Sequence, residues 1–189
     1  MAWGFNADLV NSWAYMDNVF NPEECKKIID YASTKEKEKA KVGKHKLIEK
    51  YRKNKIVWLN EKDDLHWAYR KLTDASMSLN MQYFHFDLWG FAEDLQFTQY
   101  DAPDNQYKAH VDKTYNDVIR KLSITVQLSD PNSYEGGELQ IINSANKETM
   151  KKDQGTIIAF PSYTLHQVKP VTKGTRYSLV GWITGKQFK

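Results

Sequence analysis

Three side chains with metal-binding chemistry stand at spacings that suit neighbouring strands. His110 is followed two residues later by Asp112, and residues i and i+2 of a β-strand project from the same face. His166 heads a second predicted strand. Two histidines and one carboxylate can hold non-haem Fe(II) on one face of an octahedron, and the same set can hold Zn²⁺. The triad alone therefore leaves the choice of metal open.

Arg176 adds an anion-binding group to this pattern. It follows His166 by ten residues, on the segment predicted as the last strand, where Arg176 and Ser178 share one face. A guanidinium fork with a neighbouring hydroxyl is a bidentate clamp for a carboxylate. A dicarboxylate that chelates iron with one end and meets Arg176 with the other would satisfy both groups.

The length and composition limit the scaffold that can position these residues. A chain of 189 residues is near the size of one domain, and its 41% hydrophobic and 13% aromatic content argues against disorder. The longest apolar runs have only about five residues, whereas a bilayer span needs roughly 20. The first residues show no signal-peptide pattern, so we expect a cytoplasmic protein without a membrane segment. The lone Cys25 excludes an intrachain disulfide framework and a multi-cysteine zinc site.

The first part of the chain predicts helices. Asn21 before Pro22, with two acidic residues following, is typical of a helix start, and the apolar spacing predicts a helix to about Ser33. Cys25 falls on its buried face. Lys55–Leu59 is short, apolar and β-branched, which predicts a strand, and residues 62–80 predict a second helix.

After about residue 81 the pattern changes to short alternating segments with frequent turn signals. Strands are expected near 94–100, 106–112, 120–129, 138–143, 155–160, 164–169 and 175–184. In the strand near 120–129, the polar residues Ser123, Thr125 and Gln127 are expected to share one face. Many short strands favour an antiparallel sandwich or barrel. We therefore expect an α+β, mainly β, single domain over 1–189, with a helical part at about 1–80 outside a β-core at about 81–185.

Positive charge is concentrated in Lys35–Lys55. This segment has nine Lys and one Arg against three Glu, a balance of +7 in a chain whose formal charge is only +3. A basic run can bind nucleic acid or an acidic partner. The alternation of Lys and Glu in its first residues favours the simpler interpretation of a solvated surface flap.

Taken together, the order and spacing of these motifs resemble the 2-oxoglutarate and Fe(II)-dependent oxygenases, and within them the prolyl-4-hydroxylase-like branch with its PKHD-type hydroxylases. The resemblance covers about residues 94–184, and the opening Met16–Cys25 is also similar to that branch. It is carried by Tyr100, Tyr107–Asp112, Tyr134–Leu139, Phe160–Ser162 and His166–Arg176. The resemblance implies a double-stranded β-helix, a jelly-roll core whose mouth holds the iron.

The resemblance also implies a role for each matching residue. His110, Asp112 and His166 would bind Fe(II), and Arg176 would bind the distal carboxylate of 2-oxoglutarate. Further contacts with this cosubstrate would come from Tyr100, Ser178, Gln127, Leu139, Val168 and Trp182. Relatives often have a tyrosine where this chain has Gln127, which puts that contact in question.

The implied activity is hydroxylation of an unactivated C–H bond with Fe(II), 2-oxoglutarate and O₂, and with ascorbate as an accessory reductant. A prolyl or other residue of a peptide or protein is the expected substrate. A free amino acid or small metabolite is one alternative, and a non-catalytic β-barrel binding module is another. Nucleic-acid demethylation is disfavoured, because that branch has a second arginine shortly after the clamp arginine and no arginine follows Arg176 here.

Two polar segments are candidates for a lid. Lys35–Lys55 and Asp101–Gln106 are rich in charge or turn residues, and the second directly precedes the predicted ligand strand. Loops at the mouth of a rigid scaffold commonly bind substrate, and closure excludes water from the reaction. We expect both segments to order around the substrate.

Overall fold

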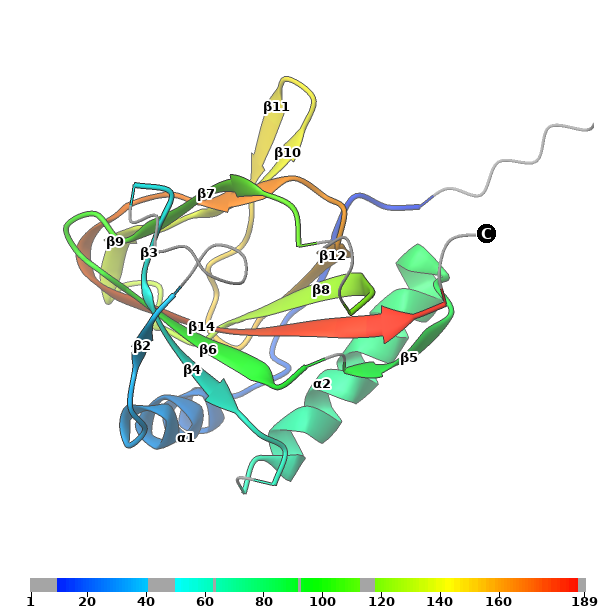
Figure 1. The fold of residues 1–189 in the computed structure, drawn as a ribbon, viewed down its shortest axis with the longest axis horizontal. Helices are drawn as coiled ribbons and strands as arrows, with labels where there is room; N and C mark the ends of the chain where they lie inside the picture. Colours follow the sequence, from blue (N-terminus) through cyan, green and yellow to red (C-terminus); the bar gives the residue numbers. More distant parts are fainter. Residues whose placement is uncertain (1–9, 41–49, 63, 92, 113–117, 187–189) are drawn as a thin grey trace, which may run out of the picture.

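The protein is built in three layers, which Figure 1 shows as a smaller sheet, a larger sheet and two helices on the far face of the larger sheet. The computed structural model describes residues 10–40, 50–62, 64–91, 93–112 and 118–186. Neighbouring strands pair antiparallel in both sheets. Two facing antiparallel sheets form the expected jelly-roll core.

Over the described residues, the larger sheet has nine strands. Seven follow the order β1-β12-β8-β14-β6-β4-β2, while β5 and β9 each pair with β14. Their bounds are Ala14–Met16 (β1), Glu38–Lys39 (β2), Lys55–Leu59 (β4), Leu88–Phe91 (β5), Leu95–Asp101 (β6), Arg120–Gln127 (β8), Tyr134–Gly136 (β9), Ile157–Pro161 (β12) and Val171–Gly185 (β14). The long strand β14 lies at the centre, so it contacts most of the sheet.

The smaller sheet has five described strands in the order β11-β10-β13-β7-β3. Their bounds are Arg52–Lys53 (β3), Gln106–His110 (β7), Leu139–Asn143 (β10), Asn146–Thr149 (β11) and His166–Val168 (β13). The β10–β11 hairpin projects from the body of the molecule in Figure 1. Strands β7 and β13 lie side by side in this sheet, which brings two distant segments of the chain together.

Helix α1 (Pro22–Ser33) begins where the sequence predicts. The Asn21 side chain accepts a hydrogen bond from the Glu24 N–H, and the Glu24 carboxylate accepts one from the Asn21 N–H, both at 2.9 Å. This capping box satisfies two backbone donors that the first turn leaves free. The helix buries Cys25, Ile28 and Ala32 against the sheet.

Helix α2 (His66–Leu79) begins four residues later than expected. Its N-cap, Leu65, has no side-chain cap, and the residues before it form a turn. The helix continues into a π-helical turn, η1 (Asn80–Phe84). The Asn80 amide closes this turn by bonding the backbone N–H and carbonyl of Phe86.

The two faces of the larger sheet have different chemistry. In β8, Leu122, Ile124 and Val126 belong to the core under the helices. The alternate residues Ser123, Thr125 and Gln127 point to the opposite side, as the alternation predicts. A second apolar cluster joins the two sheets, and it includes Tyr100, Leu139, Ile158, Phe160 and Val168. The larger sheet thus has an apolar outer face and a partly polar inner face.

The described structure refines the expected division of the chain. The first 80 residues also contain strands. Strands β1, β2 and β4 belong to the larger sheet, and β3 belongs to the smaller sheet. The Lys35–Lys55 segment is also not a bare flap, because β2 and β3 lie within it and Ala40 is buried. The central part of that segment, 41–49, lies outside the described residues. Among the described helices, none is long and apolar enough to cross a membrane.

Candidate metal and cosubstrate site

The three predicted metal ligands meet between the two sheets. His110 ends β7, His166 begins β13, and these two residues pair directly across the strands. Asp112 lies two residues beyond His110. Its carboxylate oxygens are 3.6 Å from His110 Nε2 and 3.7 Å from His166 Nε2. One ligand atom from each side chain lies within 4.8 Å of the others, a spacing that fits around a single ion.

Backbone carbonyls orient both imidazoles. His110 Nδ1 is 2.7 Å from the Lys108 carbonyl, and His166 Nδ1 is 2.9 Å from the Thr164 carbonyl. Since a carbonyl only accepts, each Nδ1 must donate, which leaves the Nε2 lone pairs directed at the Asp112 carboxylate. This is the tautomer that a metal-binding histidine requires at Nε2.

Neighbouring rings hold the imidazoles in place. The Tyr107 ring stacks on His110 with centroids 3.4 Å apart and planes within 15°. Phe160 lies against His166 at 4.6 Å between centroids. The burial of His110, together with the nearby His166, lowers the pKa of His110 to about 3. His110 is therefore neutral at pH 7 and offers a lone pair.

Asp112 is fixed by two serines. Ser123 Oγ donates to Asp112 Oδ2 at 2.8 Å and lies 3.0 Å from Ser162 Oγ. The Asp112 N–H donates to the Ser162 carbonyl at 3.0 Å. Burial by itself would raise the pKa of this carboxyl, but His166, His110 and the Ser123 hydrogen bond outweigh it and leave the pKa below its usual value. The carboxylate therefore stays charged.

Arg176 forms a second chemical centre in the same interior. Its side chain is only 1% exposed, and its guanidinium carbon lies 5.4 Å from the centre of the Tyr100 ring. Nη2 donates to Gln127 Oε1 at 2.9 Å, whereas the buried Nε and Nη1 have no hydrogen-bond partner among the described residues. A buried cation with free donors is costly unless an anion joins it. The site is therefore suited to a carboxylate.

One cavity of about 770 Å³ contains both centres. Nine of the ten predicted site residues line it: His110, Asp112, His166, Arg176, Tyr100, Ser178, Leu139, Val168 and Trp182. Gln127 is not among the lining residues and instead lies behind Arg176, to which it is bonded. Whether these residues bind iron and cosubstrate stays a prediction, but their positions are consistent with one shared pocket.

The larger sheet supplies further lining residues that the sequence pattern did not identify. Cross-strand pairing puts Thr98 opposite Ser178, and Tyr100 opposite Arg176, so Gln96, Thr98 and Tyr100 all face the cavity. The Thr98 hydroxyl is buried and has no partner. The sequence signal for Thr98 and Gln96 was their spacing from Tyr100, because residues two and four positions before it lie on the same face of the strand.

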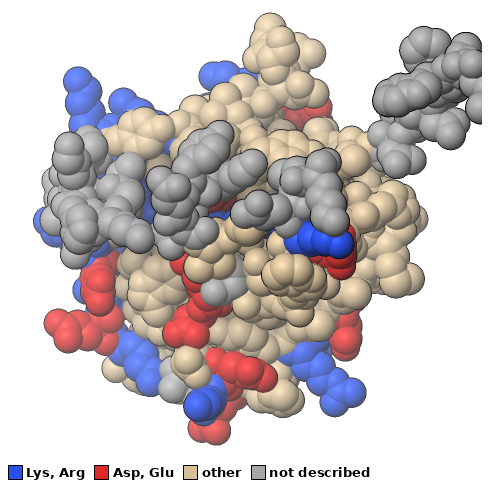
Figure 2. Space-filling model, turned by 45° about the vertical axis from the view of Figure 1, so that its right-hand side comes forward, with Lys and Arg blue, Asp and Glu red and all other residues tan. Residues whose placement is uncertain are grey.

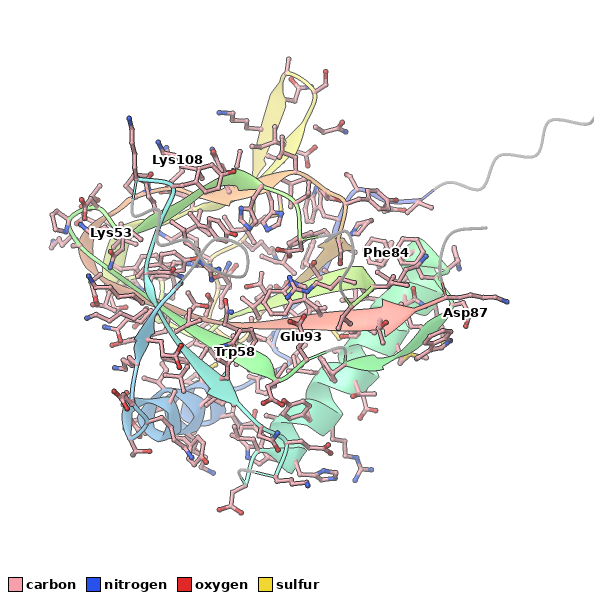
Figure 3. All side chains as sticks on the ribbon, viewed as in Figure 1. Lys53, Trp58, Phe84, Asp87, Glu93 and Lys108 are labelled. Carbon is pink, nitrogen blue, oxygen red and sulfur yellow. The ribbon has the colours of Figure 1, made fainter. Side chains whose placement is uncertain are left out.

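The outer part of the cavity is aromatic and charged. The Arg120 guanidinium lies 3.8 Å from the centre of the Trp182 ring and forms two hydrogen bonds to Glu93, at 2.6 and 2.8 Å. The Trp58 ring is 6.1 Å from Trp182 and is 39% exposed. Figure 3 shows Trp58 and Glu93 on the larger-sheet side, and Lys108 on the smaller sheet above them. Arg120, Glu93 and Trp58 were absent from the predicted site because they come from separate strands and loops.

Comparison with known proteins identifies the region that builds this site. Residues 95–184 match the model of the 2OG-Fe(II) oxygenase superfamily. The PKHD-type hydroxylase of Prochlorococcus marinus is 50% identical over 80 residues, which cover 42% of this chain and 36% of that protein. A PKHD-type hydroxylase of Picosynechococcus is 42% identical over 90 residues, which cover 47% of this chain and 41% of that protein.

Residues 95–184, slightly less than half of the chain, resemble the 2OG-Fe(II) oxygenase superfamily. The resemblance inferred from the motifs, including its PKHD-type character, is thereby confirmed for this oxygenase domain. The matched stretches span well under half the length of these curated relatives.

Solved structures extend the similarity in fold to nearly the whole chain. A Pseudomonas putida prolyl-4-hydroxylase gives a TM-score of 0.73 at 19% identity, covering 93% of this chain and 94% of that one. A Trichoplax adhaerens prolyl hydroxylase was solved with a hypoxia inducible factor peptide fragment. It gives a TM-score of 0.78 at 15% identity, covering 93% of this chain and 84% of that one. A viral collagen prolyl hydroxylase in a 2OG complex gives a TM-score of 0.71 at 24% identity, covering 93% of this chain and 97% of that one. The predicted double-stranded β-helix fold is therefore confirmed.

Proposed function

We propose that this chain is an Fe(II)- and 2-oxoglutarate-dependent dioxygenase that hydroxylates an unactivated C–H bond in a prolyl or other residue of a peptide or protein. The observation that supports the activity most strongly is the pairing of two centres in one cavity. Two imidazoles and a carboxylate lie at one centre, and at the other lies a buried arginine with two nitrogen atoms that lack a hydrogen-bond partner among the described residues.

The donor set fits the proposed metal. His110, Asp112 and His166 offer two imidazole nitrogens and one carboxylate oxygen, the set that non-haem Fe(II) oxygenases use. The protein keeps these donors oriented through the backbone carbonyls at Nδ1 and the serine at Asp112. When bound, Fe(II) with 2-oxoglutarate and O₂ would supply the oxidising chemistry for C–H hydroxylation, with succinate and CO₂ as coproducts.

Arg176 would bind the distal carboxylate of 2-oxoglutarate through the donors that have no protein partner. Ser178 shares its strand face, and Tyr100 packs beside its guanidinium. Leu139 and Val168, which pair across β10 and β13, would contact the methylene carbons of the cosubstrate. Trp182 would close the side of the pocket nearest Asp112 and exclude water from it.

A peptide or protein substrate is supported by the names of similar proteins and by the shape of the site. Structural neighbours include a prolyl hydroxylase solved with a peptide and a viral collagen prolyl hydroxylase. The cavity has room beyond a small dicarboxylate, and exposed Trp58 and Val111 flank its opening. Exposed apolar side chains of this kind suit a chain segment that lies across the mouth.

The test is a turnover assay on the purified protein with Fe(II), 2-oxoglutarate and ascorbate. We expect succinate formation, and the addition of one oxygen atom to a member of a peptide library, detected by mass spectrometry. The His166→Ala variant should lose metal binding and both products. Full turnover in that variant would refute the site, and oxygen insertion into free amino acids alone would replace the peptide proposal by the small-molecule one.

A further inference from the structure

Gln127 differs from the other predicted site residues in where its polar atoms point. It is 2% exposed and does not line the cavity. Its Oε1 accepts a hydrogen bond from Arg176 Nη2 at 2.9 Å, and its Nε2 donates to the Lys151 carbonyl at 3.0 Å. Because the Lys151 carbonyl can only accept, the amide orientation is fixed with its oxygen toward the arginine.

The stem of the Arg176 side chain is held by packing. Gly137 has φ of +64°, and a Cβ built there would lie 3.1 Å from Arg176 Cδ and 2.8 Å from Val171 Cγ2. The turn at Gly137 therefore lets the arginine stem pass close to the backbone. At the head of the side chain, Nη2 donates a hydrogen bond to Gln127 Oε1, and Tyr134 is a second side chain that interacts with the guanidinium.

We propose that Gln127 is a positioning residue for Arg176 and not a direct cosubstrate contact. This inference rests on the proposed 2-oxoglutarate site. By holding Nη2, Gln127 fixes the plane of the guanidinium and therefore the directions in which its remaining N–H donors point. Long side chains lose considerable rotamer freedom when they are ordered, so a fixed head reduces the cost of binding.

A neutral acceptor suits this task better than a charged one. A carboxylate at this position would pair with the guanidinium and compete with the dicarboxylate for it. The amide oxygen instead orients the arginine and leaves its charge uncompensated, which favours an incoming anion. Two substitutions separate these effects: Gln127→Met keeps the length and removes the acceptor, and Gln127→Glu keeps an acceptor and adds negative charge.

The experiment measures binding of 2-oxoglutarate to the Mn²⁺-loaded full chain by calorimetry, with circular dichroism to verify folding. Losing a hydrogen bond to a charged group should weaken 2-oxoglutarate by about 10-fold in Gln127→Met. Gln127→Glu should weaken it further, while Mn²⁺ affinity stays unchanged in both. 2-Oxobutyrate lacks the distal carboxylate, so its affinity should be the same in wild type and Gln127→Met.

Gln154 provides a matched control. Its Nε2 donates to the Leu128 carbonyl at 2.8 Å in the same turn region, away from Arg176. Gln154→Met should leave 2-oxoglutarate affinity at the wild-type value. An equal loss in this control, an equal loss for 2-oxobutyrate, or an unaltered affinity in Gln127→Met or Gln127→Glu would overturn the positioning role.

The same measurements separate this inference from the proposed function. If the wild-type protein does not bind 2-oxoglutarate, or if Arg176→Met binds it as well as wild type, the cosubstrate site itself is refuted. If Arg176→Met loses affinity and Gln127→Met does not, the cosubstrate site stands and Gln127 has no positioning role.

Discussion

At the scale of single residues, the site depends on groups whose partners are only partly supplied by the protein. The buried Arg176 side chain has two nitrogen atoms that lack a hydrogen-bond partner among the described residues. The Nε2 atoms of His110 and His166 both lie near the Asp112 carboxylate. Buried polar groups normally have partners, and the exceptions mark places where something else binds. Arg176, His110, His166 and Asp112 all line the same cavity.

Replacing Arg176 should separate cosubstrate binding from metal binding. Arg176→Ala removes the cation that meets the distal carboxylate, and truncating a buried charge pair costs about 2–5 kcal/mol. We expect 2-oxoglutarate affinity to fall accordingly while metal affinity is retained, both measured by calorimetry. Arg176→Lys should recover only part of the loss, because an ammonium lacks the planar fork. A dissociation constant equal to that of wild type would exclude the assigned role.

Ser123 offers a subtler test of the metal centre. It is not a proposed ligand, but its hydroxyl donates to Asp112 Oδ2 at 2.8 Å. Loss of such a supporting hydrogen bond typically lowers metal affinity by about 10–100-fold. Ser123→Ala should show this change in Fe(II) or Mn²⁺ titrations. Ser133→Ala, which alters a serine bonded to the Asp130 backbone in an exposed turn, should not. Equal affinities in the two variants would contradict the supporting role.

At the scale of elements, α1 is stabilised independently of the site. Asn21 and Glu24 form its capping box, on the outer side of the larger sheet. Asn21→Ala should reduce the free energy of unfolding by about 1 kcal/mol, as is typical for N-cap loss. Urea denaturation followed by circular dichroism measures this effect. The 2-oxoglutarate affinity of the folded variant should equal that of wild type, and a large loss would show that the helix shapes the pocket.

Elements with strong local signals could be predicted from the sequence, and weaker ones could not. Asn21-Pro22 gave the start of α1, and alternation gave β6, β8 and β14 within a few residues. Strands of two to four residues such as β2, β3 and β11 are too short to show a period, so only their partners define them. The late start of α2 follows from the missing side-chain cap at Leu65.

Site residues could be predicted where their chemical type indicates their role. They were harder to predict where the role depends on contacts with distant parts of the chain. The positions of His110, Asp112, His166 and Arg176 in one cavity agree with the sequence prediction. Gln127 was expected beside the cosubstrate, and its location behind the arginine depends on cross-strand pairing with Ser178 and on the turn at Lys151. Such contacts between distant segments leave no local pattern in the chain.

At the scale of the whole molecule, the charge distribution around the cavity is uneven. Blue side chains in Figure 2 gather toward one edge of the visible face, whereas red and blue are mixed below. Lys53 on β3 pairs with Asp104 in the turn after β6, and Lys55 on β4 pairs with Asp101 at the end of β6. The two segments predicted to form a lid are therefore linked by ion pairs. Their closure over a substrate stays a prediction, because residues 41–49 lie outside the described part of the chain.

The depth of the cavity has a kinetic consequence. Arg176 is 1% exposed at the inner end, whereas Trp58 is 39% exposed and Val111 46% exposed at the opening. A peptide lying across Trp58 and Val111 would block the route to Arg176. We therefore expect compulsory order: 2-oxoglutarate adds before the peptide, and succinate leaves after the hydroxylated product. Initial-rate and product-inhibition patterns would reveal this sequence, and random addition would mean that a second route leads to the arginine. Depth within the fold would then determine the order of events in time.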